Sequence, residues 1–246
     1  MIRIGRCKYD KYGKRSDPTF PDYIPIVVLM KGHSKWGVLG PYELKDDNGC
    51  ILENIFQFSK CYERVPPVTL SKSRWDRTII WSHPAEIHCS KGLIQPTYWE
   101  WRFKGMTNPY AVRYPVGYSP SMRSKCLFSI PDEEHPEIRL GYIDARKQIY
   151  VRWYCDLVKK CDEYNDLIEM LNEGTNLLII EVDGPHQETL SYYQEHYGVD
   201  DDFIENDTML ATEENLSIML NDDKHPFGHG YCLAMALLNM EHLAED

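Results

Sequence analysis

The sequence lacks the long apolar segment that a membrane-spanning helix requires, since it contains no run of 18 apolar residues and the run at residues 24–30 has only the length of a strand. Its first residues include no apolar core of the kind found in secretory signal peptides. Its eight cysteines include no Cys-x-x-Cys pair, which argues against a zinc site. We therefore expect a cytoplasmic protein with reduced cysteines, no association with membranes, no metal and no cofactor.

What the sequence does contain is enough apolar material for a substantial core, with 43% hydrophobic and 12% aromatic residues among 246. The net charge of −11 is unevenly distributed. Residues 60–125 contain eleven Lys and Arg against four Asp and Glu, whereas residues 126–246 contain seven against twenty-seven. A basic segment within an acidic protein predicts one local anionic ligand. The alternative is that surface charge segregates here by chance.

Patterns along the chain predict an α+β fold, predominantly helical, in a single domain over residues 1–246. Residues 1–22 are expected to form an N-terminal arm, and residues 95–140 a long insertion of loops and short strands. The β-branched run at 24–30 and the apolar run at 176–182 predict strands. Helices are expected at 50–63, 84–91, 144–171 and 230–242.

Three polar residues, Glu53, Gln57 and Lys60, recur along one face of the predicted helix at 50–63. At about 100° per residue, this spacing places a carboxylate, an amide and an amine in one line. The line can be a solvent-exposed ladder of polar side chains or the reacting part of an active site. The second interpretation needs another carboxylate, and Asp183 follows the predicted strand at 176–182. Asp183 can also be a turn residue that accepts from its own backbone.

At these residues the sequence resembles the NADAR (YbiA-like) N-glycosidases. Leu39-Gly40-Pro41-Tyr42, followed by Glu53-x3-Gln57-x2-Lys60, is similar to the opening signature of that family. Four further segments follow in the family's order, namely Ser82 to Gly92, Arg146 to Tyr154, Tyr164 to Leu171 and Asn176 to Asp183. The five segments together account for about half of the chain.

The resemblance implies a YbiA-like domain that hydrolyses an N-glycosidic bond at the anomeric carbon of a ribose. Some members remove ADP-ribose from guanine bases, and others act on ribosylated pyrimidine intermediates of riboflavin synthesis. The implied partners are a nucleotide or ADP-ribosyl substrate and modified DNA. The sequence departs from the family after Asp183, where Gly184-Pro185-His186 stands in place of Trp-Gly, and in residues 95–140, which short members lack. Because both departures lie where substrate is held, the substrate is the least transferable property.

We expect Glu53 and Lys60 to be the reacting pair, with Asp183 as a further catalytic carboxylate. A carboxylate stabilises the oxocarbenium-like centre that forms when the base departs. Lys60 can instead attack the anomeric carbon and form a Schiff base, and both routes stay open. The residues expected to bind substrate are Gln57 at the ribose hydroxyls, Arg113 and Arg146 at a phosphate, and Tyr42, Gly40 and His186.

A different class of function is also consistent with the sequence. Aromatic and basic residues alternate in Tyr98 to Lys104 and again at Arg113-Tyr114, a composition that suits unpaired bases and phosphates. Such a chain would be a nucleotide-binding or single-stranded nucleic-acid-binding module. The alternative for these rings is an aromatic subcore. Binding alone does not require the Glu-x3-Gln-x2-Lys line, so that line favours the enzyme. A third interpretation, a structural or interaction protein, rests on the acidic C-terminal half.

Overall fold

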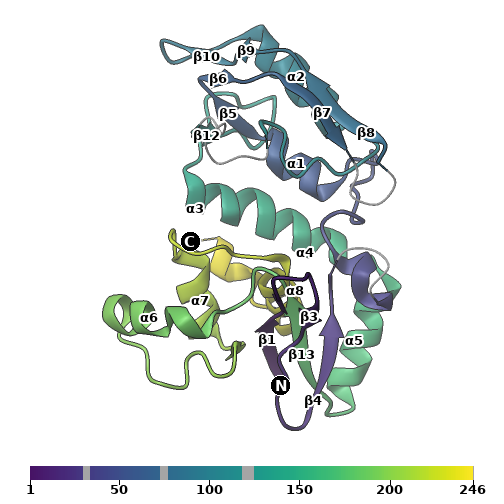
Figure 1. Cartoon of the computed structure of the whole chain (residues 1–246), viewed down its shortest axis with the longest axis vertical. Helices are drawn as coiled ribbons and strands as arrows, with labels where there is room; N and C mark the ends of the chain where they lie inside the picture. The colour runs from purple at the N-terminus through teal and green to yellow at the C-terminus, as the bar shows by residue number, and fades with distance from the viewer. Residues whose placement is uncertain (30–33, 73–76, 118–124, 246) are drawn as a thin grey trace. The chain divides into compact units, whose positions relative to one another are not determined.

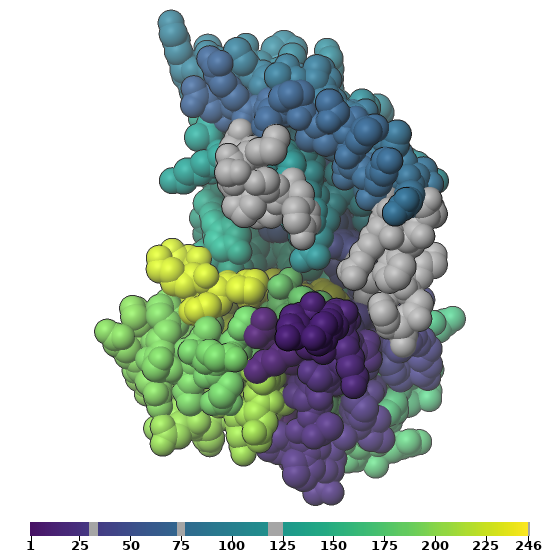
Figure 2. Space-filling model, in the orientation of Figure 1, coloured from purple at the N-terminus to yellow at the C-terminus, as the bar shows by residue number. Residues whose placement is uncertain are grey.

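The computed structural model describes residues 1–29, 34–72, 77–117 and 125–245, shown as a ribbon in Figure 1 and in space-filling form in Figure 2. The fold is α+β, as predicted, with a mixed sheet and several two-stranded sheets. The chain divides into two compact units, which the single-domain prediction did not include. Unit 1 consists of Met1–Leu44 and Val151–Asp246, and unit 2 of Lys45–Tyr150.

Unit 1 is built on a four-stranded sheet in the order β14-β1-β13-β4. These strands are Thr208–Leu210, Ile2–Arg6, Asn176–Glu181 and Tyr23–Val27, respectively. β13 pairs in parallel with both β1 and β4, whereas β14 is antiparallel to β1. The buried run of β13 is typical of an inner parallel strand. The strand predicted at 176–182 is confirmed, and so is the one at 24–30 up to Val27, with Met30 outside the described residues.

The prediction of an N-terminal arm is wrong for Ile2–Arg6, because this segment is an inner strand of the sheet. Ile2 and Ile4 are buried, as is Arg3, whose guanidinium carbon lies 3.7 Å from the centre of the Phe20 ring. The Arg3 Nε atom donates to Thr208 Oγ1 at 3.0 Å. The sequence alone does not show that Arg3 is buried, because the residues that contact its guanidinium group, Phe20 and Thr208, are distant along the chain. A short hairpin, β2 (Lys8–Tyr9) with β3 (Arg15–Ser16), follows.

The helices of unit 1 include α8, which is apolar on nearly every side and buried from Gly230 to Leu237. Buried tyrosines connect the helices of this unit by hydrogen bonds. Tyr154 donates to the Leu39 carbonyl at 2.7 Å, and Tyr164 donates to the Ala236 carbonyl of α8 at 3.0 Å. The helices are η1 (Lys35–Leu39), α4 (Arg152–Val158), α5 (Asp162–Asn172), η4 (Gln187–Thr189), α6 (Leu190–Tyr197), α7 (Glu213–Asn221), α8 (His229–Leu238) and η5 (Glu241–Ala244).

Two of the helix predictions fall in unit 1 wholly or in part. The helix predicted at 230–242 is present as α8, which ends at Leu238 and is capped by Asn239, whose φ of 56° is left-handed. The tract predicted at 144–171 is not one helix, because Cys161 adopts extended backbone and separates α4 from α5. Its beginning is α3 (Tyr142–Ala145) followed by a π-helical stretch, Arg146–Val151.

Unit 2 is held together by aromatic packing between α1 (Leu52–Phe58) and α2 (Pro96–Met106). The Phe58 ring centre lies 4.5 Å from that of Trp101 and 4.8 Å from that of Trp81. Gly105 is required where the helices approach, because a Cβ atom there would lie 2.0 Å from the Phe58 ring. Short antiparallel pairs complete the unit, namely β5 (Lys60–Tyr62) with β12 (Cys126–Ser129), β6 (Arg64–Val65) with β9 (Glu86–Ile87), β7 (Val68–Lys72) with β8 (Ile79–His83), and β10 (Cys89–Ser90) with β11 (Leu93–Ile94).

Three secondary-structure predictions in unit 2 are wrong. The helix expected at 50–63 ends at Phe58, because Lys60–Tyr62 pairs with β12 instead. The helix expected at 84–91 is replaced by β9 and β10, whose partners β6 and β11 satisfy the backbone. The insertion expected at 95–140, with loops and short strands, contains helix α2 instead. Pro96 does not prevent this helix, because it lies in the first turn, where proline is tolerated.

None of the helices built from the described residues has both the length and the apolar character needed to span a bilayer. All eight cysteines fall within the described ranges, and each is a free thiol.

Candidate functional site

The three polar side chains predicted to share a helix face form a hydrogen-bonded chain in unit 2. Gln57 Nε2 donates to Glu53 Oε1 at 3.0 Å, and Lys60 Nζ donates to Gln57 Oε1 at 2.9 Å. Glu53 is buried, with 7% of its surface exposed, whereas Gln57 and Lys60 are half-buried. The predicted line therefore exists, although Lys60 reaches it from the first residue of β5 rather than from the helix.

Apolar residues of α1 hold this polar face in place. Leu52, Ile55 and Phe58 are buried, and Phe58 packs in the aromatic core of unit 2. Phe56 lies beside the polar line, with its ring centre 4.3 Å from Lys60 Nζ and 4.9 Å from the centre of the Tyr150 ring. The amine of Lys60 thus has an aromatic face on one side and the amide oxygen of Gln57 on another.

This arrangement determines how the amide of Gln57 is oriented. Its oxygen accepts from a lysine, and its nitrogen donates to a carboxylate, so exchanging the two ends would place like groups together. Gln57 therefore positions both Glu53 and Lys60. Chemically, the chain offers a buried carboxylate that can stabilise positive charge and an amine that can act as a nucleophile or a proton donor.

The two arginines predicted to bind phosphate belong to unit 2 and differ in exposure. Arg113 is exposed, and its guanidinium carbon lies 5.3 Å from the centre of the Tyr114 ring. Arg146 is buried, with 2% of its surface exposed, and its guanidinium carbon lies 4.8 Å from the centre of the Tyr142 ring. Of the two, Arg113 has the accessibility that a ligand from solution needs.

The other predicted site residues lie in unit 1, namely Gly40, Tyr42, Asp183 and His186. Asp183 is half-buried in the turn that follows β13. His186 is also half-buried, and burial, with the nearby charge of Arg6, lowers its pKa. Gly40 is buried and Tyr42 half-buried directly after η1.

The sequence interpretation missed a buried acid in unit 1, Glu181, the last residue of β13. Glu181 is 1% exposed, and His229 Nδ1, at the start of α8, lies 3.3 Å from its Oε2 atom. Burial and then the neighbouring Asp183 raise its pKa to about 8, opposed by the first backbone N–H groups of α8. The signal available in the sequence was a carboxylate at the end of an apolar strand, together with the Gly-His-Gly start of a helix.

A second missed cluster in unit 1 surrounds the buried carboxylate of Asp222. Tyr193 donates to its Oδ2 atom at 2.7 Å, Tyr192 donates to Oδ1 at 3.1 Å, and His225 Nδ1 lies 2.6 Å from Oδ2. Burial by itself would raise the pKa of Asp222, but the bonds from Tyr193, from the Lys224 backbone and from His225 outweigh burial and lower it. The cluster joins α6 to the segment that precedes α8.

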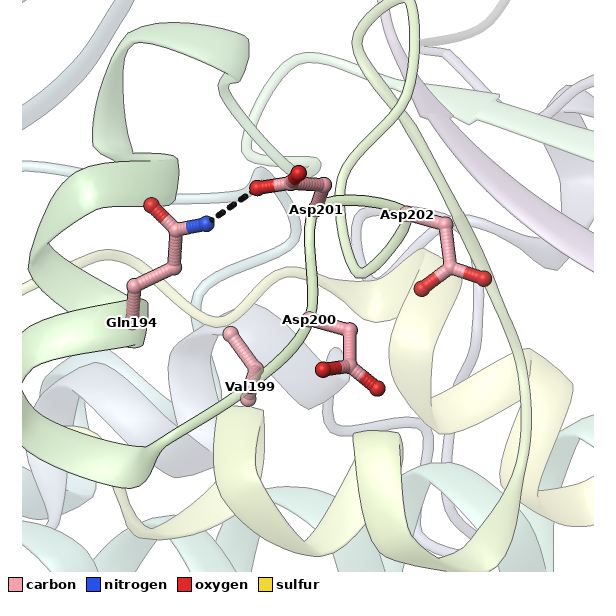
Figure 3. A pocket seen from close by; sticks show the side chains of 5 residues that line it. All are labelled: Gln194, Val199, Asp200, Asp201 and Asp202. Carbon is pink, nitrogen blue, oxygen red and sulfur yellow. Dashed lines mark hydrogen bonds between the residues drawn. The ribbon is translucent and has the colours of Figure 1, made fainter.

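Unit 1 also contains a surface hollow of about 420 Å³, shown in Figure 3. It is lined by Gln194, Val199, Asp200, Asp201 and Asp202, and Gln194 Nε2 donates to Asp201 Oδ1 at 2.7 Å. None of these residues belongs to the predicted site. Three carboxylates in succession repel the anionic ligand that the basic segment predicts.

The aromatic stretch that suggested a nucleic-acid platform lies mainly in the core of unit 2. Tyr98 and Trp101 are buried, and so is Arg102, which donates to the Ile130 and Pro131 carbonyls at 2.7 and 3.1 Å. Phe103, by contrast, is 65% exposed. The rings of Tyr98 and Trp101 are therefore covered by protein and do not offer a face for bases.

Within the described part of the chain, no three His, Cys, Asp or Glu side chains are grouped so that they could hold a metal ion. In comparisons with protein-family models, with curated proteins and with solved structures, none matches this chain.

Proposed function

We propose that this protein is an N-glycosidase that hydrolyses the bond between a ribose and a nucleobase-like amine. The observation that supports this proposal is the chain Glu53–Gln57–Lys60, in which a buried carboxylate is oriented by an amide that is itself held by an amine. An exposed ladder of polar side chains would not need a carboxylate with only 7% of its surface accessible.

Glu53 supplies the electrostatic part of the proposed reaction. Departure of the base leaves positive charge on the anomeric carbon and the ring oxygen of the ribose. A carboxylate shielded from water stabilises that charge more strongly than an exposed one, since the local dielectric constant is lower. Gln57 keeps Glu53 in one orientation before the substrate arrives, so little reorganisation is needed during the reaction.

Lys60 supplies the nucleophile in the first of two routes. Its amine bonds to the anomeric carbon, the bond to the base breaks, and the base leaves with a proton. Opening of the ribose ring then yields a Schiff base, which water hydrolyses to free ribose and the original amine. In the second route, water attacks the anomeric carbon directly while Glu53 stabilises the positive charge that develops there.

The proposed substrates carry a phosphate, because the exposed Arg113 lies in the basic segment. Following the resemblance of the sequence, the first candidate is ADP-ribose attached to guanine bases of DNA. The second is a ribosylated pyrimidine of riboflavin synthesis. Both contain the same ribose–nitrogen bond, and the chemistry proposed for Glu53 and Lys60 applies equally to each.

The test is a panel of three compounds: a guanine-ADP-ribosylated oligonucleotide, a ribosylaminopyrimidine phosphate and NAD. Released base is detected by mass spectrometry for the wild type, for Glu53→Gln and for the control Glu63→Gln, which alters an exposed carboxylate of the same unit. We expect wild type and Glu63→Gln to release base from at least one compound and Glu53→Gln to be strongly slowed. Equal rates in all three proteins, or no release by the wild type, would refute the proposal.

A further inference from the structure

A fully buried asparagine next to the proposed reacting carboxylate holds a distant loop against helix α1. Asn54 has 0% of its surface exposed. Its Nδ2 atom donates to the Asn108 carbonyl at 3.1 Å and to the Tyr110 carbonyl at 3.0 Å, while its Oδ1 atom accepts from the Val112 N–H at 2.8 Å. One side chain thus satisfies three backbone groups of a segment more than fifty positions away in the sequence.

The segment 108–115, called here the anchored loop, is fixed at other points as well. The Asn108 side chain donates to the Ile80 carbonyl at 2.7 Å and accepts from the Tyr110 N–H at 2.9 Å. At the far end, the Pro115 carbonyl accepts from Trp81 Nε1 at 3.0 Å, and His83 Nε2 lies 3.1 Å from the same oxygen.

Between these attachments the anchored loop presents a cation and a ring. Val112 is buried with 0% exposure, whereas the next residue, Arg113, is exposed and lies beside the half-buried ring of Tyr114. Because Val112 is the residue that Asn54 holds, the backbone position of Arg113 follows from a hydrogen bond to α1. Two neighbouring residues of α1 therefore have different roles. Glu53 belongs to the polar line, and Asn54 fixes the loop that carries Arg113.

We propose that Asn54 is a positioning residue that holds Arg113 at a phosphate subsite for a nucleoside phosphate or diphosphate, at a constant distance from Glu53. The inference rests on the proposed function, and it adds the residue that couples anion recognition to the reacting helix. A guanidinium needs a defined position to form paired hydrogen bonds with phosphate oxygens, and an unattached loop would lose that advantage. Asn54 itself needs no contact with the substrate.

The experiment measures binding of free ADP-ribose, with adenosine as the phosphate-free comparison, by calorimetry. The proteins are wild type, Asn54→Ala, Arg113→Gln, the double variant, and the control Asn48→Ala in an exposed turn. We expect each of the first two substitutions to raise the Kd for ADP-ribose about tenfold, the scale of one charge-assisted hydrogen bond. The double variant should be no weaker than the weaker single variant, because both remove the same interaction. Adenosine binding should change little.

Hydrogen exchange provides a readout that does not depend on ligand. The Val112 amide should exchange faster in Asn54→Ala, while amides of α1 keep their protection. Asn108→Ala, which removes the side-chain bonds of the anchored loop to the Ile80 carbonyl and the Tyr110 N–H, should also raise the Kd for ADP-ribose and serves if Asn54→Ala fails to fold. Additive losses in the double variant, unchanged ADP-ribose affinity in Asn54→Ala, or no binding of ADP-ribose by the wild type would overturn the inference.

These outcomes are separable from those of the glycosidase test. Absence of base release with coupled ADP-ribose binding would refute the proposed reaction and leave the role of Asn54 standing. Base release that depends on Glu53, with a KM for phosphorylated substrate that Asn54→Ala leaves unchanged, would refute the role of Asn54 alone.

Discussion

The imidazole of His229 lies between two oxygen acceptors of unit 1, with Nδ1 3.3 Å from Glu181 Oε2 and Nε2 2.6 Å from the Val28 carbonyl oxygen. A carbonyl can only accept, so Nε2 carries a proton. The contact with Glu181 then requires a second proton, on His229 Nδ1 or on the carboxyl group itself. The pair therefore holds one more proton than a neutral histidine beside a carboxylate.

This pair predicts a defined dependence of stability on pH. Burial raises the pKa of Glu181 to about 8 from an ordinary value of 4.5, so the folded protein retains a proton that the unfolded chain has released. The stabilisation that comes from this proton is complete below the unfolded value and is lost as the pH rises through the folded value. Urea unfolding between about pH 5 and about pH 9 should show this decline, on the order of a few kcal/mol, in the wild type.

Glu181→Gln is the matched variant, because it keeps the shape of the side chain and removes the ionisation. We expect it to flatten the decline, so that the difference in unfolding free energy between variant and wild type changes with pH. Parallel curves for the two proteins over the whole range would contradict a raised pKa at this residue.

Gly228 should not tolerate a side chain. A Cβ atom there would lie 2.0 Å from Glu181 Oε2, so Gly228→Ala should cost about 1–3 kcal/mol through overpacking. Gly141 is the control, since it is also a helix N-cap with negative φ and its Cβ would meet only the end of the Asp144 side chain at 3.3 Å. Chemical denaturation of both variants measures the difference. A similar loss in each would mean that capping, rather than the approach of Glu181, determines the requirement at Gly228.

The covalent route predicts a trapped intermediate on Lys60. Borohydride added during turnover should reduce the Schiff base and leave a ribosyl adduct on that residue, which peptide mass spectrometry locates. Lys60→Ala should then abolish release of the base, and Glu53→Gln should slow it about 10²- to 10⁴-fold, the range of general acid–base assistance. Lys72→Ala, at an exposed position on β7, is the control. Full activity in Lys60→Ala without an adduct would instead favour direct attack by water.

Arg102 and Arg113 should respond to substitution in opposite ways. Arg102→Met leaves the Ile130 and Pro131 carbonyls without their donor and should lower the unfolding free energy by about 2–4 kcal/mol. Arg113→Gln alters an exposed side chain and should change stability by less than about 0.5 kcal/mol while weakening binding of phosphorylated ligands. Thermal unfolding and calorimetry, performed on the same two variants, distinguish the roles. A stability loss in Arg113→Gln equal to that in Arg102→Met would contradict the assignment.

Local spacing was sufficient where an interaction joins residues close in the chain. The intervals from Glu53 to Gln57 and from Gln57 to Lys60 bring these side chains within hydrogen-bond reach, and they remain so although the helix ends at Phe58. The apolar run at the centre of β13, residues 177–180, likewise predicts an inner strand, because a strand that is buried on both faces is apolar at successive positions.

Contacts between distant parts of the chain decided the rest. Arg3 and Arg102 are charged, so the sequence predicts that both are exposed. In the structure, the Phe20 ring covers Arg3, and Arg102 donates to the carbonyls of residues 130 and 131. The three backbone partners of Asn54 lie more than fifty residues away, so no local sequence pattern predicts these hydrogen bonds. The sequence by itself determined the polar line and the inner strand through periodicity. Only the tertiary structure decided which charged side chains are buried, because the groups that compensate them come from elsewhere in the chain.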